Sequence, residues 1–210
     1  MASPLLANLY MNRFLKHWRQ TERGRAFRAY VVNYADDFVI LSRGCATEAL
    51  AWTKAVMTRI GLTLNETKTS LKDARHESFD FLGYTFGPHH ATGDGHVYLG
   101  ASPSKKSVQR LKTKVGDMLV SGEKRAWPQV CTRLNRVLNG WSAYFHHGAL
   151  RSSYTAIDRH VCESVRTFLA KRSKLQGRGA RAFSQDKVFG ELGVKRLMRW
   201  GSGSTSTVLP

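Results

Sequence analysis

The chain has 210 residues, of which 42% are hydrophobic and five are tryptophan, so it can bury the core of one ordinary domain or two small ones. No uncharged apolar stretch reaches about 18 residues and no basic residue precedes the apolar N-terminal segment, so the sequence predicts a cytoplasmic protein without a membrane span or signal peptide. Three widely spaced cysteines without a C-x-x-C pair argue against disulfides and a zinc site, whereas a net charge of +18 indicates a polyanionic partner.

The first predicted element is a helix over residues 3–20. Ser3 can cap its N-terminus, and Pro4 suits the first helical position. Apolar residues then recur at helical spacing, namely Leu5, Leu6, Leu9, Met11, Phe14, Leu15 and Trp18. A basic, glycine-containing connection over residues 21–28 follows.

Two runs of β-favouring residues, 30–34 and 38–41, flank Ala35, Asp36 and Asp37, which is the pattern of a β-hairpin. Adjacent carboxylates repel each other unless a cation neutralises them. Mg²⁺ takes carboxylate oxygens together with substrate phosphates, and two such ions can activate an attacking hydroxyl and stabilise the leaving oxygen in nucleotidyl transfer. A bare Asp-Asp pair more often marks an ordinary turn, so the neighbouring motifs decide between the two interpretations.

The rest of the first half is predicted to combine one helix with short strands. Residues 46–60 favour a helix with Thr47 as its cap and Gly61 at its end. Residues 62–64 and 69–71 are short strand candidates, and the aromatic segment 79–86 is predicted as a strand pair broken at Gly83. We expect a turn over residues 88–95 and a closing strand over residues 96–99.

At residues 101–104 the sequence becomes helical and basic, so we place a domain boundary between residues 101 and 102. Residues 1–102 carry 12 basic and nine acidic side chains, a net charge of +3, whereas residues 103–210 carry 21 and six, a net charge of +15. Such a field repels itself, so we expect a polyanionic partner, with nucleic acid first and an acidic membrane surface second. Aromatic residues among the charges favour nucleic acid, namely Trp127, Trp141, Tyr144 and Phe145.

Three amphipathic helices with basic outer faces are predicted beyond this boundary, which is typical of a small bundle. Their apolar stripes are Val108, Leu111, Val115 and Leu119, then Trp127, Val130, Leu134, Val137, Leu138 and Trp141, then Tyr154, Ile157, Val161, Val165, Phe168 and Leu169. A weak helix over residues 185–199 and a disordered tail over residues 200–210 complete the chain. We therefore expect an α+β fold with domains at residues 1–101 and 102–199.

Residues 34–37 (Tyr-Ala-Asp-Asp), enclosed by their apolar runs, resemble the active-site hairpin of reverse transcriptases, and further motifs follow in that family's order. Residues 3–10 resemble the serine-proline helix start, residues 61–69 the next palm motif, and residues 81–86 the strand pair that holds the primer end. Residues 134–145 resemble the maturase-specific thumb of group II intron proteins, which separates them from retron-type relatives. By these motifs the chain is identified as a member of the group II intron reverse transcriptases.

The resemblance implies a partial reverse-transcriptase palm followed by an α-helical thumb. It implies an RNA-directed DNA polymerase that uses an RNA template, a DNA primer, deoxynucleotides and two Mg²⁺ ions. It also implies that the protein binds its group II intron RNA and assists its splicing. Whether the chain forms a homodimer stays open.

The resemblance also assigns roles to single residues. Asp36 would be a direct metal ligand, Asp37 would support the metal site, and Tyr34 would lie near the primer terminus and the incoming nucleotide. Lys68 would be a general acid for the departing pyrophosphate, although an exposed strand-end lysine is the alternative. The primer backbone would be gripped by Leu82, Gly83 and Tyr84.

In the predicted thumb, the apolar stripes must face inward, so basic residues between them are expected to project toward RNA, namely Lys112, Arg133 and Arg136. Trp141, Tyr144 and Phe145 share one helical face and suit either the thumb core or RNA stacking.

The chain also departs from the family pattern. The family's first catalytic aspartate and its fingers lie upstream of the serine-proline helix, and the Gln-Gly that usually precedes that helix is absent. The Cys-pair zinc signature of the family's endonuclease domain is absent too, and the pairs His89-His90 and His146-His147 lack matched partners for zinc. We therefore expect a truncated enzyme that is inactive alone. The alternatives are a non-catalytic maturase fragment that binds intron RNA, and the remnant of a decayed mobile element.

Overall fold

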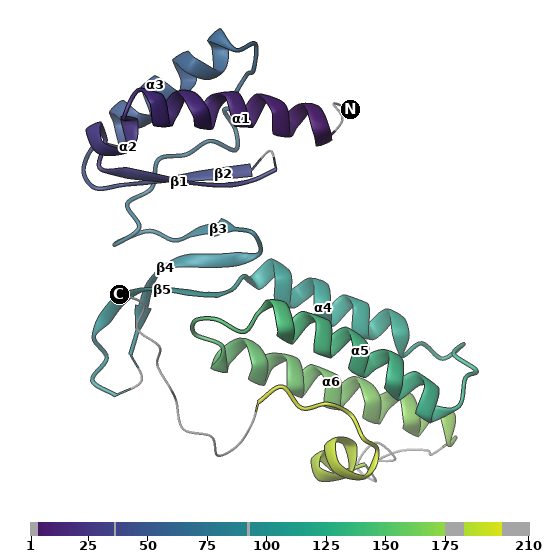
Figure 1. Cartoon of the computed structure of the whole chain (residues 1–210). Helices are drawn as coiled ribbons and strands as arrows, with labels where there is room; N and C mark the ends of the chain where they lie inside the picture. Colours follow the sequence, from purple (N-terminus) through teal and green to yellow (C-terminus); the bar gives the residue numbers. More distant parts are fainter. Residues whose placement is uncertain (1–3, 36, 92, 175–182, 199–210) are drawn as a thin grey trace. The chain divides into compact units, whose positions relative to one another are not determined.

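The computed structural model describes residues 4–35, 37–91, 93–174 and 183–198. It divides the chain into two compact units, Met1–Asp73 (unit 1) and Ala74–Pro210 (unit 2), and each unit has its own hydrophobic core. The fold is α+β, as the sequence predicted, because unit 1 joins helices to a β-hairpin and unit 2 joins a small antiparallel sheet to helices (Figure 1). Within the described residues, no helix is long and apolar enough to cross a membrane.

Unit 1 consists of helix α1 (Pro4–Gln20), the short helix α2 (Arg23–Ala26), the hairpin strands β1 (Ala29–Tyr34) and β2 (Asp37–Ser42), and helix α3 (Ala46–Arg59). Helices α1 and α3 lie over one face of the hairpin (Figure 1). Between them is a core of aromatic and aliphatic side chains, in which the Phe14 ring lies 5.7 Å from the Phe38 ring. The predicted helix and hairpin are both confirmed, while the predicted cap Ser3 lies outside the described residues.

Helix α3 ends at Arg59, and Gly61 closes it as the predicted C-terminal cap, because Gly61 has a φ of +81° and the Leu62 N–H donates back to the Met57 carbonyl at 2.9 Å. The predicted cap Thr47 is wrong. The helix begins at Ala46, and Cys45 stands at the cap position with its N–H donating to Ser42 Oγ at 3.3 Å. Serine 42 therefore ties the end of β2 to the start of α3.

The strands predicted at residues 62–64 and 69–71 do not form, although both segments are described. A turn centred on Asn65 replaces them. Its side-chain Oδ1 accepts the N–H groups of Thr67 and Lys68 at 3.1 and 3.2 Å, and local hydrogen bonds of this kind compete with strand pairing.

Unit 2 begins with an antiparallel sheet of β3 (Phe79–Phe81), β4 (Tyr84–His90) and β5 (Val97–Pro103), in the order β3-β4-β5. The strand pair around Gly83 and the closing strand are confirmed. The turn predicted to start at residue 88 is wrong in its bounds. Strand β4 continues to His90 because Pro88, His89 and His90 pair with β5.

Helices α4 (Lys105–Met118), α5 (Trp127–Tyr144) and α6 (Arg151–Arg172) lie side by side, as the three apolar stripes predicted (Figure 1). The most deeply buried residues of their shared core are Val115, Leu134, Leu138, Val165 and Val188. The sheet and the helices belong to one compact unit, so the compact units meet at residues 73/74. The division of the family's domains after residue 101 stays a prediction.

The weak helix predicted over residues 185–199 is confirmed at its start but is wrong in its length, because the helical residues end at residue 191. Residues 185 and 186 are α-helical and lead into a π-helical turn, η2 (Lys187–Glu191), which ends with the Leu192 N–H donating to the Lys187 carbonyl at 2.9 Å. Residues 193–198 then contact α5 and α6 without regular secondary structure. We call residues 192–198 the strap. The tail at residues 200–210 lies outside the described residues.

Candidate functional site

The tip of the β1-β2 hairpin brings two of the predicted site residues together. Tyr34 ends β1, Asp37 begins β2, and the two residues pair across the hairpin, which leaves two residues between the strands. Ala35 takes a left-handed φ of +52°, as tight hairpin turns require. Tyr34 is 65% exposed and Asp37 is also exposed, so both are accessible to a ligand. Asp36 lies outside the described residues.

The register of the hairpin determines where Tyr34 and Asp37 lie. Side chains alternate along β1, so Ala29 faces the unit 1 core while Tyr30, Val32 and Tyr34 face outward. The six consecutive pairs from Ala29 and Ser42 to Tyr34 and Asp37 hold the strands together up to the turn. The packed strands therefore position Tyr34 and Asp37, although both residues are exposed.

The carboxylate of Asp37 is the type of oxygen donor that Mg²⁺ prefers. Within the described ranges, which leave out residue 36, no three or more His, Cys, Asp or Glu side chains gather at a possible metal site. His89 and His146, which belong to the two histidine pairs, instead lie against backbone carbonyls, at 3.0 Å from Gly87 and 2.6 Å from Ala143. The described residues therefore offer a carboxylate at the hairpin tip and no complete ligand set.

Lys68 belongs to the same compact unit as the hairpin and occupies an exposed turn rather than a strand end. Its N–H donates to the Asn65 carbonyl at 3.0 Å. Glu66, in the same turn, pairs with Lys54 of α3 at 2.9 Å. The turn is therefore anchored to α3, while the Lys68 side chain extends into solvent.

The predicted primer-gripping residues form the β3-β4 turn in unit 2. Leu82 and Gly83 have φ values of +49° and +81°, a pair typical of a two-residue hairpin turn. The Gly83 carbonyl accepts the Ser104 N–H at 2.8 Å and the Ser107 hydroxyl at 2.9 Å. The start of α4 therefore holds this turn.

Two tyrosines join the same turn to the end of α5. The Tyr84 hydroxyl donates to the Tyr144 carbonyl at 2.9 Å, and the Tyr144 hydroxyl donates to the Leu82 carbonyl at 2.9 Å. The Tyr84 ring also lies 5.0 Å from the ring of Phe145. The sequence placed these residues in different domains, yet they form one joint between the sheet and the helices.

The structure shows different burial for the three aromatic residues whose role, core packing or RNA stacking, the sequence left open. Phe145 is buried, and Trp141 is half-buried with its ring 4.6 Å from Phe145 and 5.9 Å from Tyr154, so both belong to packed parts of unit 2. Tyr144 is 54% exposed and carries the turn contact. Packing therefore explains Trp141 and Phe145 without a ligand.

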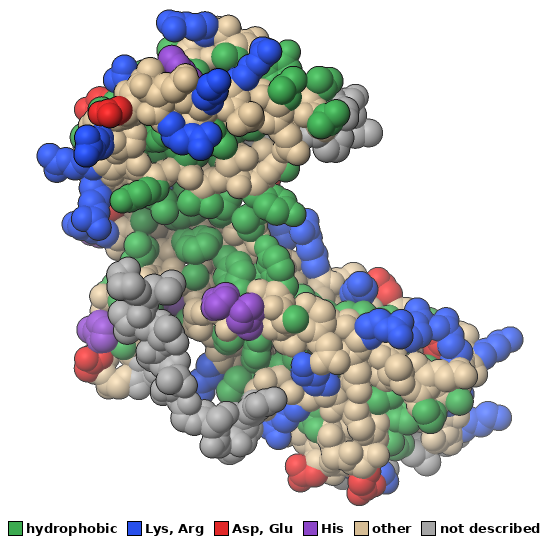
Figure 2. Space-filling model, viewed as in Figure 1, with side chains coloured by type: hydrophobic (Ala, Val, Ile, Leu, Met, Phe, Trp, Pro, Cys, Tyr) green, Lys and Arg blue, Asp and Glu red, His purple; other side chains and the backbone are tan. Residues whose placement is uncertain are grey.

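The basic residues predicted to meet RNA lie on two helices of unit 2. Arg133 and Arg136 are exposed on α5, and Lys112 is half-buried on α4. Arg133 Nη1 lies 3.5 Å from Glu123 Oε2, and the Arg133 side chain is 44% exposed whereas that of Glu123 is 11% exposed. Figure 2 shows many Lys and Arg side chains and few acidic ones on the visible face of the helices. Further exposed basic residues on the three helices are Lys105, Lys106, Arg110, Lys114, Arg151, Arg159, Lys171 and Arg172.

Polar residues that attach the strap were missed by sequence reasoning. Asn135 donates to the Gly193 carbonyl at 2.8 Å and accepts the Lys195 N–H at 2.7 Å. The buried carboxylate of Asp158 accepts the N–H groups of Leu197 and Met198, both at 2.9 Å. The sequence held one signal for this attachment: Asp158 is a charged residue on the apolar stripe of a predicted helix, which indicates a buried hydrogen-bond partner.

Burial raises the pKa of Asp158 above its ordinary value, while the two N–H donors and the nearby Arg196 charge act in the opposite direction. Burial likewise raises the pKa of the Cys131 and Cys162 thiols. Both thiols are therefore held in their protonated form at neutral pH and behave as packed core residues.

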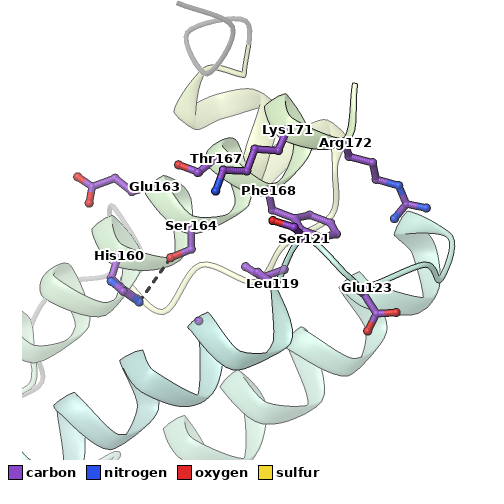
Figure 3. Close-up of a pocket in the computed structure, with 11 residues that line it drawn as sticks. Leu119, Ser121, Glu123, His160, Glu163, Ser164, Thr167, Phe168, Lys171 and Arg172 are labelled. Carbon is purple, nitrogen blue, oxygen red and sulfur yellow. Dashed lines mark hydrogen bonds between the residues drawn. The ribbon is translucent and has the colours of Figure 1, made fainter. Parts of the chain in front are cut away.

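A hollow of about 400 Å³ lies between α6 and the segment after α4 (Figure 3). His160 and Ser164 lie on one side, with His160 Nε2 3.4 Å from Ser164 Oγ and 3.1 Å from the Lys112 carbonyl. Arg172 and Glu123 lie on the other side, whereas the Lys171 side chain points toward Thr167 (Figure 3). The mixed charges give this hollow no preference for an anion or a cation.

Two family models match the chain. The model described as reverse transcriptase (RNA-dependent DNA polymerase) matches residues 1–86, and the model described as group II intron, maturase-specific domain matches residues 108–184. The first match covers the hairpin and the β3-β4 turn, and the second covers most of α4 with α5 and α6. No protein of curated function matches the chain.

Proposed function

The chain belongs to the group II intron reverse transcriptases that carry a maturase-specific domain, and from this premise we propose that it serves RNA-directed DNA synthesis and binds group II intron RNA. The carrying observation is the hairpin tip, where a tight antiparallel register presents Tyr34 and Asp37 together. The proposed substrates are an RNA template, a DNA primer and deoxynucleotides.

In this proposal Asp36 and Asp37 hold Mg²⁺ at the hairpin tip. The exposed carboxylate of Asp37 supports this assignment by its donor type and its position at the start of β2. Bound Mg²⁺ would supply charge stabilisation at the attacking and leaving oxygens. The protein's own contribution is to hold the carboxylates and Tyr34 rigidly, and to supply Lys68 as the proton donor for pyrophosphate.

The polypeptide of residues 1–210 is expected not to extend a primer by itself, because the resemblance assigns a further metal-binding aspartate to a strand that precedes the serine-proline helix. The test is primer extension on an RNA template with Mg²⁺, by the polypeptide alone and after fusion to fingers and an early palm segment from a related enzyme. We expect activity from the fusion alone. Extension by the 210 residues, abolished by Asp36→Ala, would contradict this expectation.

In the active fusion, Asp36→Ala should abolish incorporation and Asp37→Ala should be tolerated better. Lys68→Ala should slow incorporation by about 10²–10⁴ while template binding is unchanged, since general acids contribute about that much. Lys16→Ala, which removes an exposed lysine of α1, is the matched control. An unchanged rate for Lys68→Ala would mean that Lys68 is an exposed turn residue without a catalytic role.

Binding of structured RNA by unit 2 is the second part of the proposal, and RNA binding without catalysis is the alternative function. The net charge of +15 after residue 102 and the exposed basic faces of the helices support it. Replacing Lys112, Arg133 and Arg136 by alanine should weaken binding to different RNAs alike, because phosphate contacts position without specifying. The charge-preserving set Lys112→Arg, Arg133→Lys and Arg136→Lys is the control. Undetectable or salt-insensitive RNA binding in filter assays would count against this role.

A further inference from the structure

Unit 1 contains an arginine-lined hollow that the proposed function does not use. Its volume is about 930 Å³, and it lies where the end of α1 and helix α2 meet the start of β1 and the end of β2. Four arginines line it together with two aromatic residues, namely Arg19, Arg25, Arg28, Arg43, Trp18 and Tyr30. We call it the arginine hollow.

The charge of the first half of the chain is concentrated at this corner. Residues 13–28 hold six basic residues and one acidic residue, a net charge of +5, whereas all of residues 1–102 sum to +3. The remainder of that half is therefore slightly acidic. Among the described residues that line the hollow, Glu22 is the acidic one, and its 3.9 Å pair with Arg25 is exposed and weak. The corner therefore attracts anions although its half of the chain is nearly neutral.

The backbone holds these arginines in place. Arg28 has a left-handed φ of +44°, a conformation that glycine or asparagine adopts with less strain. Its N–H donates to the Arg25 carbonyl at 3.1 Å, and its carbonyl accepts the Arg43 N–H at 3.1 Å. These hydrogen bonds link the backbones of Arg25 in α2, Arg28 before β1 and Arg43 after β2. They therefore position the Cα atoms of the three arginines relative to one another.

The side chains around the arginine hollow differ in whether they are packed or accessible. Arg23 lies over the Phe27 and Trp52 rings at 5.6 and 5.4 Å, and its side chain therefore belongs to the packed part of the unit. Arg19, Arg25, Arg28 and Arg43 are exposed. Tyr30 is 79% exposed, an unusual exposure for an aromatic residue on a strand whose neighbours pack inward. The hollow thus combines accessible guanidinium groups with an accessible aromatic ring.

We propose that the arginine hollow binds the phosphodiester backbone of single-stranded or bulged RNA and that Tyr30 stacks on an unpaired base. Guanidinium groups bind phosphate oxygens in a bidentate manner, and aromatic side chains stack on splayed bases. The residues of this RNA site are different from those of the hairpin tip and from those of the basic helices of unit 2. It rests on the proposed function for the choice of RNA as the polyanion.

The test is arginine footprinting on the unaltered chain. Phenylglyoxal modification is mapped by mass spectrometry with and without a single-stranded RNA oligonucleotide. Arg25, Arg28 and Arg43 are expected to be protected, whereas Arg13 and Arg59, which are exposed in the same unit but do not line the hollow, are expected to react equally in both samples. Equal reactivity at all five arginines would overturn the inference, as would protection by phosphatidylserine vesicles without protection by RNA.

A charge variant gives the quantitative test. In Arg25→Ala/Arg28→Asn/Arg43→Ala, asparagine is chosen because it tolerates the left-handed backbone at position 28. The slope of log affinity against log salt should fall by roughly 0.7 for each lost contact to single-stranded RNA, so by about 2 in total. The control Arg13→Ala/Lys16→Ala/Arg59→Ala removes the same charge elsewhere in unit 1 and should keep the slope.

The outcomes distinguish the inference from the proposed function. Equal slopes in both variants, with RNA binding intact, overturn the arginine hollow and leave the RNA-binding role of unit 2 standing. Absence of RNA binding by the unaltered chain overturns both. Circular dichroism melts of the variants identify a loss of folding, and the footprint on the unaltered chain decides the question in that case.

Discussion

The β3-β4 turn shows how closely single residues are fitted in unit 2. A Cβ atom at Gly83 would lie 2.9 Å from Ser107 Oγ and 3.1 Å from Phe145 Cζ, and the residue also has a φ of +81°. Both conditions exclude a side chain at this position. The sequence analysis explained Gly83 by the close approach of a primer backbone. Packing against Ser107 and Phe145 already requires a glycine at this position.

Gly83→Ala should destabilise unit 2. The left-handed backbone alone costs roughly 1–2 kcal/mol for a residue with a Cβ atom, and the contacts with Ser107 and Phe145 add to it. Gly140→Ala is the matched control, because this α5 glycine has nothing within 4 Å of an added Cβ atom. The control should stabilise by about 0.5–1 kcal/mol. Thermal melts that rank the two variants in the opposite order would contradict this account.

Trp141→Ala should lower the stability of unit 2 by about 3 kcal/mol, the lower end of the range for large aromatic residues, because Trp141 is half-buried against Phe145 and Tyr154. Among the described residues its buried Nε1 has no hydrogen-bond partner. Trp141→Phe removes that donor and keeps a ring, so it should cost much less. RNA affinity measured well below the melting temperature should be unchanged in both variants. A drop in affinity at full stability would instead indicate stacking on RNA.

At the scale of elements, the strap is held by side chains rather than by secondary structure. Its backbone contacts Asn135 and Asp158, and Lys195 Nζ donates to Asn139 Oδ1 and to Ser142 Oγ. Val194 and Leu197 are buried in the core that α4, α5 and α6 share. The strap therefore closes the helical core although it has no regular structure of its own.

Asp158→Ala should release the end of the strap, because the N–H groups of Leu197 and Met198 lose their acceptor. An unsatisfied buried group costs about 1–3 kcal/mol. Asp158→Asn keeps one acceptor oxygen and should be milder. Hydrogen exchange measured by mass spectrometry should show faster exchange at residues 192–198 in the alanine variant. Unchanged protection there would mean that Val194 and Leu197 hold the strap without the carboxylate.

The raised pKa of Asp158 also predicts a pH dependence. Because burial raises the pKa above its ordinary value of 3.8, the folded state binds a proton that the unfolded state has already lost over the interval above 3.8. This contribution to stability is fully present below 3.8 and is lost as the pH rises through the raised pKa. Denaturant melts from about pH 3 to pH 7 should therefore show unfolding free energy falling with pH more in the unaltered chain than in Asp158→Asn. A difference of the opposite sign would contradict the raised pKa.

At the scale of the whole molecule, a net charge of +18 on 210 residues predicts that added salt has opposite effects on stability and on RNA affinity. Added salt screens the repulsion between basic side chains, so the melting temperature of the RNA-free chain should rise with KCl concentration. The same salt competes with the protein for phosphates, so RNA affinity should fall. Both effects are measurable on one sample by melts and filter binding from about 0.05 to 0.5 M KCl. A melting temperature that falls with salt would show that attractive ion pairs outweigh the repulsion.

The sequence by itself determined the elements whose partners are close along the chain. The helical stripes of α1, α4, α5 and α6 and the two β-favouring runs of the β1-β2 hairpin predicted these elements, because helical turns and hairpins are set by residues a few positions apart. The sequence predicted Asp37 in the turn, whereas the structure makes it the first residue of β2, paired with Tyr34. The sequence thus identified the class of fold, while the chemistry at the hairpin tip stays a prediction.

The tertiary structure alone decided the segments whose partners are distant. Residues 192–198 do not continue the predicted helix. Their backbone N–H groups donate instead to the side chains of Asn135 and Asp158, which lie about 40–60 residues away along the chain. The β3-β4 turn is fixed by Ser104, Ser107 and Tyr144, and the arginine hollow exists because Arg43 at the end of β2 lies beside Arg28. Local propensity carries no information on such contacts, because the hydrogen bonds and buried surfaces that decide them form only when distant segments pack together.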